Sequence, residues 1–294
     1  MAFDIVATTS SVWLDALRIA VLIIIALIYA AYDVFNKRDI PDVLAYLSLA
    51  VGAVFTLTLG FPTIIYSALV AIAIGAISYL LYKGGQLGLG DGFEFVAISL
   101  IMPVQGIPIL LQTNQFGLPF MLSVFVATGI TTIVFVPLYY ISKMKKKLPQ
   151  RLEAKQLVKA GTLVIAYGVL FLFVTWAFGF KPAVLCILGI IAAASAVMIL
   201  YERDMMRMMV ENVFPKQLDD GDIIAIEMMS AKNVAFFKEK SKNFGKLATI
   251  ELIRKLSGVK KKIPVYKKAI PLALPTLIGV LVALLFGNLL LYIL

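Results

Sequence analysis

Two aspartates stand where a carboxylate is energetically unfavourable. Asp33 ends a long apolar run, and Asp91 begins another, within the sequence Gly88-Leu89-Gly90-Asp91. A carboxylate at the end of a membrane helix is a candidate functional residue, because charge in hydrocarbon is costly. Two neighbouring carboxyls cannot both ionise easily, so the pair holds one shared proton. One aspartate then acts as a base on water while the other donates to a carbonyl oxygen, which is the chemistry of peptide hydrolysis without a metal.

Five of the nine residues from 84 to 92 are glycine. Glycine permits positive φ and close backbone approach, so an extended substrate strand could lie beside Asp91. Gly88, Gly90 and Gly92 are therefore candidate supporting residues, although a flexible turn between two spans would look similar. No Lys-Ser or Lys-Thr follows, which excludes a P-loop, and no strand–helix unit surrounds the segment, which argues against a dinucleotide fingerprint.

The chain contains no histidine and a single cysteine, Cys186. The missing histidine excludes a metalloprotease of the HExxH type and any nucleophile that needs a histidine base. A single cysteine excludes an internal disulfide and a Cys₄ zinc site. We therefore expect neither a metal nor a cofactor, and carboxylates remain the strongest candidates for hydrolysis, with a Ser/Lys dyad as the remote option.

The composition is that of a membrane protein. The chain is 61% hydrophobic and 15% charged, against roughly 45–50% and 25% for ordinary globular chains, and its mean hydropathy is +0.96. The net charge of +10 does not indicate nucleic-acid binding, because the bases are not interleaved with aromatic residues on a soluble domain. We expect the lipid bilayer as the partner instead.

Eight segments approach the ~20 apolar residues that a bilayer requires. They predict an all-α polytopic membrane protein of about eight transmembrane helices, with a small mixed cytoplasmic domain before the last helix. We divide the chain into a catalytic membrane core (1–142), a basic loop and extra helical hairpin (143–201), a cytoplasmic domain (202–269) and a last span (270–294). The expected spans are 12–32, 43–60, 62–82, 93–112, 118–141, 161–179, 182–201 and 270–293.

The cytoplasmic domain is expected to have mixed structure. Residues from Glu202 to Val213 look helical, Asp219-Asp220-Gly221-Asp222 looks like a turn of solvated acids, and residues from Asn233 to Leu256 look like an amphipathic helix. A cation site at the three aspartates is the weaker alternative, because the further ligands of an EF-hand loop are missing.

The distribution of basic residues predicts the topology. Four alternate connections, 33–42, 83–92, 143–160 and 202–269, hold 25 of the 27 Lys and Arg residues. The positive-inside rule places these connections in the cytoplasm and both termini outside the cell membrane. An even number of spans separates Asp33 from Asp91, so both lie on the cytoplasmic side.

Three segments together resemble one protein family. Asp33 followed by Lys37-Arg38-Asp39-Ile40-Pro41-Asp42, the segment Gly88-Leu89-Gly90-Asp91-Gly92, and the final-span sequence Ala269-Ile270-Pro271-Leu272-Ala273-Leu274-Pro275 are similar to motifs of the archaeal type IV prepilin and preflagellin peptidases. These are GxGD intramembrane aspartyl proteases. The Cys pairs of bacterial members that also methylate their products are absent, so we expect no methyltransferase activity.

The resemblance implies an aspartic endopeptidase that removes a short basic leader, a class III signal peptide, from pilin- or archaellin-like precursors at the cytoplasmic face. It implies Asp33 and Asp91 as the catalytic pair, with Pro271 and the glycines as supporting residues. Glu94, Asp39 and Asp42 are candidates to attract the Lys and Arg of the leader.

Two other functions stay open at this point. The presenilin and signal-peptide-peptidase group also has Tyr-Asp, GxGD and Pro-Leu-Ala-Leu-Pro-like segments, but its two aspartates lie on consecutive helices. An ion- or proton-coupled transporter would use intramembrane acids and a broken helix, although transport acids usually lie near the bilayer midplane.

Overall fold

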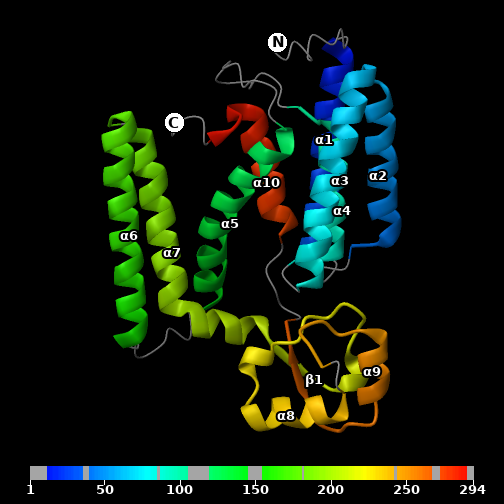
Figure 1. The fold of residues 1–294 in the computed structure, drawn as a ribbon, viewed down its shortest axis with the longest axis vertical. Helices are drawn as coiled ribbons and strands as arrows, with labels where there is room; N and C mark the ends of the chain where they lie inside the picture. Colours follow the sequence, from blue (N-terminus) through cyan, green and yellow to red (C-terminus); the bar gives the residue numbers. More distant parts are fainter. Residues whose placement is uncertain are drawn as a thin grey trace. The chain divides into compact units, whose positions relative to one another are not determined.

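The computed structural model describes residues 12–35, 40–84, 87–104, 119–144, 154–180, 182–241, 244–266 and 272–289 (Figure 1). The chain divides into two compact units. We call Met1–Ser78, Leu89–Leu200 and Pro271–Leu294 the membrane unit, and Tyr79–Gly88 with Tyr201–Ile270 the polar unit.

Each of the eight predicted apolar segments contains a helix. Five of these helices are long and apolar enough to cross a membrane, while α2 and α10 are shorter apolar helices and α4 has 13 residues. The fold is therefore that of an all-α polytopic membrane protein, as the sequence predicts. The helices are α1 (Val12–Phe35), α2 (Asp42–Leu57), α3 (Phe61–Lys83), α4 (Leu89–Ile101), α5 (Phe120–Met144), α6 (Ala154–Phe178), α7 (Pro182–Met209) and α10 (Ala273–Phe286).

The helix that carries Asp91 differs from the predicted span 93–112. It begins at Leu89, so Asp91 lies in its first turn, where an acidic side chain interacts favourably with the helix dipole. The described helix ends at Ile101, because Pro103 disfavours the helical conformation of the residue before it. The first helix also differs from its predicted span, 12–32, because α1 continues to Phe35 and so includes Asp33.

Small residues let α4 pack closely against α2. A Cβ atom on Gly52 would lie 2.8 Å from Leu100 Cβ, so only glycine fits at this crossing. Next to it, Thr56 Oγ1 donates a hydrogen bond of 2.9 Å to Leu100 O and lies 3.3 Å from Ser67 Oγ of α3. Close approach through small residues, with hydroxyl hydrogen bonds between helices, is how membrane helices associate when all surfaces are apolar.

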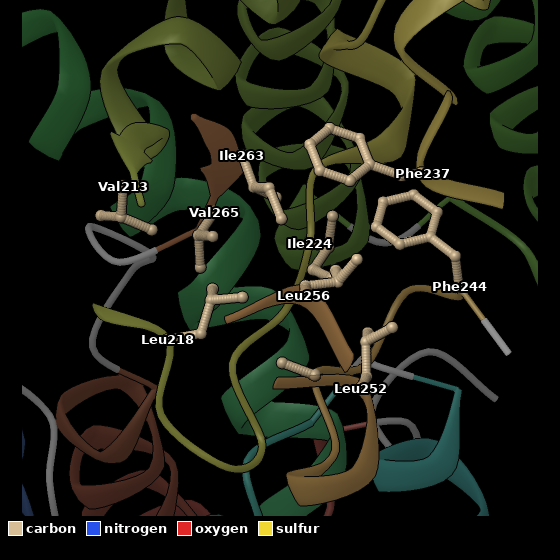
Figure 2. Packing of buried hydrophobic residues seen from close by; sticks show 10 residues of the cluster. Val213, Leu218, Ile224, Phe237, Phe244, Leu252, Leu256, Ile263 and Val265 are labelled. Atoms are coloured by element: carbon tan, nitrogen blue, oxygen red, sulfur yellow. The ribbon is translucent and has the colours of Figure 1, made fainter. Parts of the chain in front are cut away.

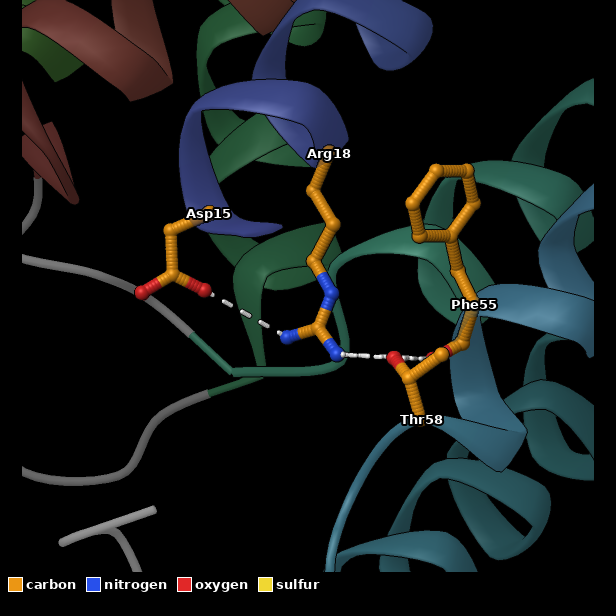
Figure 3. Close-up of polar contacts among 4 residues, drawn as sticks. All are labelled: Asp15, Arg18, Phe55 and Thr58. Carbon is orange, nitrogen blue, oxygen red and sulfur yellow. Dashed lines mark hydrogen bonds and ion pairs between the residues drawn. The ribbon is translucent and has the colours of Figure 1, made fainter. Parts of the chain in front are cut away.

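A buried arginine joins α1 to the end of α2. Arg18 Nη2 donates to Thr58 Oγ1 at 2.7 Å and to Phe55 O at 3.4 Å, and Nη1 pairs with Asp15 Oδ1 at 3.5 Å (Figure 3). A cation at a helix C-terminus satisfies carbonyls that have no partner within the helix. Arg18, the basic residue within the first predicted span, therefore connects α1 to the C-terminal end of α2.

The last helix packs against α5 through a glycine. A Cβ on Gly279 would lie 2.2 Å from Thr128 Oγ1 and 2.8 Å from Thr128 N, and the latter contact is with backbone. The helices α10 and α1 also contact each other. By contrast, only 6% of the apolar windows of α6 and α7 is buried within the protein, which leaves both helices available to lipid.

The polar unit has its own core around a two-stranded antiparallel sheet. Strand β1 (Glu211–Val213) pairs with β2 (Ile263–Val265), with Val213 opposite Ile263. Short helices cover the sheet: the 3₁₀ helices η1 (Pro215–Gln217) and η2 (Ile226–Met228), and the α-helices α8 (Ala231–Lys240) and α9 (Ile250–Leu256). Figure 2 shows the core side chains Val213, Leu218, Ile224, Phe237, Phe244, Leu252, Leu256, Ile263 and Val265.

Two secondary-structure predictions for this unit are wrong. The predicted helix from Glu202 to Val213 ends at Met209, because Glu211–Val213 pair as a strand. The predicted helix from Asn233 to Leu256 is two helices. Between α8 and α9, Leu247 forms an isolated antiparallel bridge with Ile223, and Gly221 N donates to Ala248 O at 2.8 Å.

The acidic turn of the polar unit is structural. Asp219 N donates to Asp222 Oδ2 at 2.9 Å, Gly221 has φ +89°, and Asp220 Oδ1 accepts from Ile250 N at 3.1 Å. Asp220 therefore holds the first residue of α9. This use of carboxylate oxygens agrees with the predicted turn.

Gly279→Ala is expected to destabilise the protein by about 1–3 kcal/mol, because the added methyl group would push α10 away from the α5 backbone. The midpoint of thermal unfolding of the purified protein in detergent measures this. Gly129→Ala is the matched control on α5: its Cβ would meet nothing within 4 Å, so it should leave the midpoint unchanged or raise it. Equal midpoints for the two variants would contradict the close contact.

Candidate active site

Asp33 lies at the junction of α1 and α10. Its side chain is 6% exposed, and Oδ2 accepts a hydrogen bond of 2.9 Å from the backbone N–H of Ala273, the first residue of α10. The first N–H groups of a helix have no partner within the helix and carry partial positive charge. Asp33 therefore occupies a position that stabilises its ionised form.

Asp91 lies in the first turn of α4, between two glycines that fit against neighbouring side chains. A Cβ on Gly90 would lie 2.9 Å from Ile40 Cδ1, and one on Gly92 would lie 3.0 Å from Ser78 Cβ. The two glycines therefore allow α4 to pack closely on both sides of Asp91. Asp91 itself is partly exposed.

Glu94 follows Asp91 by three residues, which places both on one face of α4. Its side chain is 0% exposed, and among the described residues neither carboxyl oxygen has a hydrogen-bond partner. It interacts electrostatically with Asp91 and with Asp33. Glu94 thus connects the two aspartates, which come from helices far apart in the sequence.

A hydroxyl pair completes this cluster. Tyr29 is fully buried four residues before Asp33 on α1, and its hydroxyl lies 2.9 Å from Ser48 Oγ of α2. Tyr29 also interacts electrostatically with Glu94 and Asp91. Ser48 Oγ uses its own proton to donate to Ala45 O at 2.8 Å. In the contact between the two hydroxyls, Tyr29 is therefore the donor and Ser48 the acceptor.

Asp33 and Glu94 are buried and Asp91 is partly exposed, and the charge of each aspartate acts on the carboxyl group of Glu94, so each negative charge disfavours the next. Asp33 accepts a hydrogen bond at the N-terminus of α10, an arrangement that is compatible with general acid–base chemistry. In the described part of the chain, no group of three or more His, Cys, Asp or Glu residues could hold a metal ion.

The structure brings some of the predicted site residues together and leaves others apart. Asp33, Asp91 and Glu94 share one cluster, whereas Gly88 is an exposed residue directly before α4, and Pro271 lies outside the described residues. Positive φ among the described glycines occurs only at 179, 221 and 287, so the glycines beside Asp91 serve close packing instead. The expected glycine loop ends at Gly88, because Gly90 and Gly92 are part of α4.

Sequence analysis missed three contributors: the hydroxyls of Tyr29 and Ser48, and the backbone N–H of Ala273. The spacing of Tyr29 and Asp33, one helical turn apart, is the signal that could have found the tyrosine. No sequence signal points to a backbone N–H that comes from a helix 240 residues away.

Comparison with known proteins gives one match. The family model of the type IV leader peptidase family matches residues 20–137, a segment that includes Asp33, Asp91 and Glu94. No curated protein and no solved structure matches the chain.

Replacing Asp33 tests whether its hydrogen bond from Ala273 N–H or its negative charge determines the stability of the junction between α1 and α10. Asp33→Asn keeps an oxygen that can accept from Ala273 N–H and removes one ionisable group, so we expect stability equal to or above that of the wild type. Asp33→Leu leaves the Ala273 N–H without its acceptor, which costs about 1–3 kcal/mol. The midpoint of thermal unfolding in detergent distinguishes these outcomes. If the Asn and Leu variants unfold at the same temperature, the hydrogen bond is not what holds this junction.

Proposed function

We propose that this membrane protein is a leader-peptidase-type aspartic endopeptidase with Asp33 and Asp91 as its catalytic pair. The match of residues 20–137 to the type IV leader peptidase family supports this proposal. The observation that carries the proposal is that Asp33 and Asp91 both interact with the same enclosed carboxyl group, that of Glu94. This shared interaction of aspartates from α1 and α4 supports their assignment as a pair.

We assign the base to Asp33, because the Ala273 N–H and the N-terminus of α10 favour its ionised form. Asp33 takes a proton from water as the water oxygen attacks the peptide carbonyl carbon, and Asp91 donates the shared proton to the carbonyl oxygen. The resulting diol then collapses: the C–N bond breaks, the leaving nitrogen takes the proton from Asp33, and a diol hydroxyl returns a proton to Asp91.

The substrate is a precursor protein with a short basic leader, of the pilin or archaellin kind, and cleavage occurs at the cytoplasmic face. The distribution of Lys and Arg among the connections supports this topology, with both termini outside. Asp42, exposed in the first turn of α2, is the described acid that we assign to the basic leader. Glu94 is enclosed, so we place it behind the catalytic pair.

Asp33→Asn and Asp91→Asn should each abolish cleavage, because an amide can neither hold the shared proton nor accept one from water. The measurement is the product mass after incubating membranes that contain each variant with a panel of leader-bearing precursors. Asp15→Asn is the matched control, since Asp15 is half-exposed and lies in the first turn of α1, at the other end of the helix from Asp33. Normal cleavage by either catalytic variant, present at wild-type level in the membrane, would disprove the assignment.

The proton of the third carboxyl is assigned to Glu94. An unpaired charge is least favourable where the side chain is fully enclosed and has no hydrogen-bond partner among the described residues. A neutral Glu94 would let the two aspartates share a single negative charge, and its O–H group, which has no partner among the described residues, would be available as a donor.

Glu94→Gln should therefore keep cleavage within about threefold of wild type and leave its pH profile in place, because glutamine is neutral and donates hydrogen bonds. Glu94→Leu removes the donor and should slow cleavage by about tenfold. Initial rates of precursor cleavage across a pH series provide both results. A Gln variant as slow as the Leu variant, or one whose pH profile moves to lower pH, would mean that Glu94 acts as a charge.

A further inference from the structure

The polar unit contains a basic hollow at some distance in sequence from the carboxyl cluster. The hollow has a volume of about 710 Å³ and is lined by Phe214, Lys216, Ser257, Gly258, Val259 and Lys260. This described lining contains two ammonium groups and no carboxylate. All of its residues belong to the polar unit, which packs around its own core.

A third lysine belongs to the same surface. Lys262 Nζ lies 5.2 Å from the centre of the Phe214 ring, and Phe214 itself is 41% exposed. Among the described residues, Lys216, Lys260 and Lys262 take part in no ion pair. Three positive charges therefore lie on the surface that exposes this aromatic ring, and none of them forms an ion pair in the described part of the chain.

An aromatic ring flanked by lysines suits one kind of partner in particular. Lysine ammonium groups bind the phosphates of anionic lipids, and an exposed Phe enters the boundary between headgroups and acyl chains. The polar unit is attached to an apolar helix at each end, since the chain enters it from α7 and leaves it toward α10. This attachment makes such a surface available to lipid. Phe214 lies five residues after the end of α7 at Met209.

We propose that the surface formed by Phe214, Lys216, Lys260 and Lys262 binds the phosphate headgroups of anionic lipids in the membrane that the protein spans. The strand pairing of β1 with β2 brings the two parts of this surface together, because Val213 lies opposite Ile263. Residues on either side of these paired positions thus form one surface although they are more than forty positions apart. This inference does not depend on the proposed protease activity.

The test uses the full chain in lipid nanodiscs. A Cys186→Ser background removes the single native thiol, and Ser257→Cys carries an environment-sensitive fluorophore at the edge of the hollow. Discs of phosphatidylcholine alone are compared with discs that contain phosphatidylglycerol, and nitroxide-labelled headgroups report contact by quenching. We expect a blue shift and quenching only with phosphatidylglycerol, and both should weaken at 1 M salt, where the Debye length falls to about 3 Å.

The triple variant Lys216→Gln, Lys260→Gln, Lys262→Gln should lose the lipid-bound state. Each lysine near an anionic surface contributes about fivefold, so the ratio of bound to free should fall by about a hundredfold. The same three positions changed to Arg keep the charge and should retain binding. The matched control is Lys232→Gln, Lys238→Gln, Lys240→Gln, an equal charge change on exposed positions of α8, which should also retain binding.

Three results would overturn the proposal. The first is equal fluorescence in both kinds of disc. The second is an equal loss of quenching in the α8 control, which would indicate a diffuse effect of net charge. The third is the same shift with inorganic phosphate in phosphatidylcholine discs, which would indicate a site for a soluble anion.

Discussion

Three carboxyl groups in one apolar helical core are the constraint on which the membrane unit depends. Like charges in a low-dielectric environment repel one another and are poorly solvated. Asp33 is supported by the Ala273 N–H, Asp91 by its place in the first turn of α4, and Glu94 by neither. The three carboxyl groups therefore lie in unequal environments, and acid–base catalysis uses carboxyl groups whose environments differ.

Close helix packing maintains this arrangement against electrostatic repulsion. Gly52 lets α4 approach α2, Gly92 lets it approach α3, and Gly279 brings α10 onto α5. Each of these contacts fixes a helix that contributes to the carboxyl cluster. Because lipid is as apolar as the side chains, shape complementarity and hydrogen bonds such as that of Thr56 replace the hydrophobic driving force. Side-chain size at a few glycines therefore sets the geometry of the site.

The polar unit shows which of its short segments can be predicted from local sequence patterns and which cannot. Its acidic turn was predictable, since Asp and Gly cluster there, and Asp222 and Asp220 bond to nearby backbone. The helix predicted from Asn233 to Leu256 is wrong, because backbone bonds between Ala248 and the acidic turn outweigh local helix propensity. The pairing of Val213 with Ile263, which forms the basic hollow, is a contact between distant segments that no local pattern contains.

The sequence by itself determined the class of protein and the chemistry available to it. Long apolar segments must become membrane helices, since unpaired backbone groups are not tolerated in lipid, and the missing histidine left carboxylates as the strongest candidates. The positions of Asp33 and Asp91 at helix ends also followed from these segments. Only the tertiary structure decided that Glu94 is fully buried and interacts with both aspartates, that Tyr29 pairs with Ser48, and that Ala273 donates to Asp33. Burial and backbone hydrogen bonds between distant helices arise from packing, which no local sequence pattern encodes.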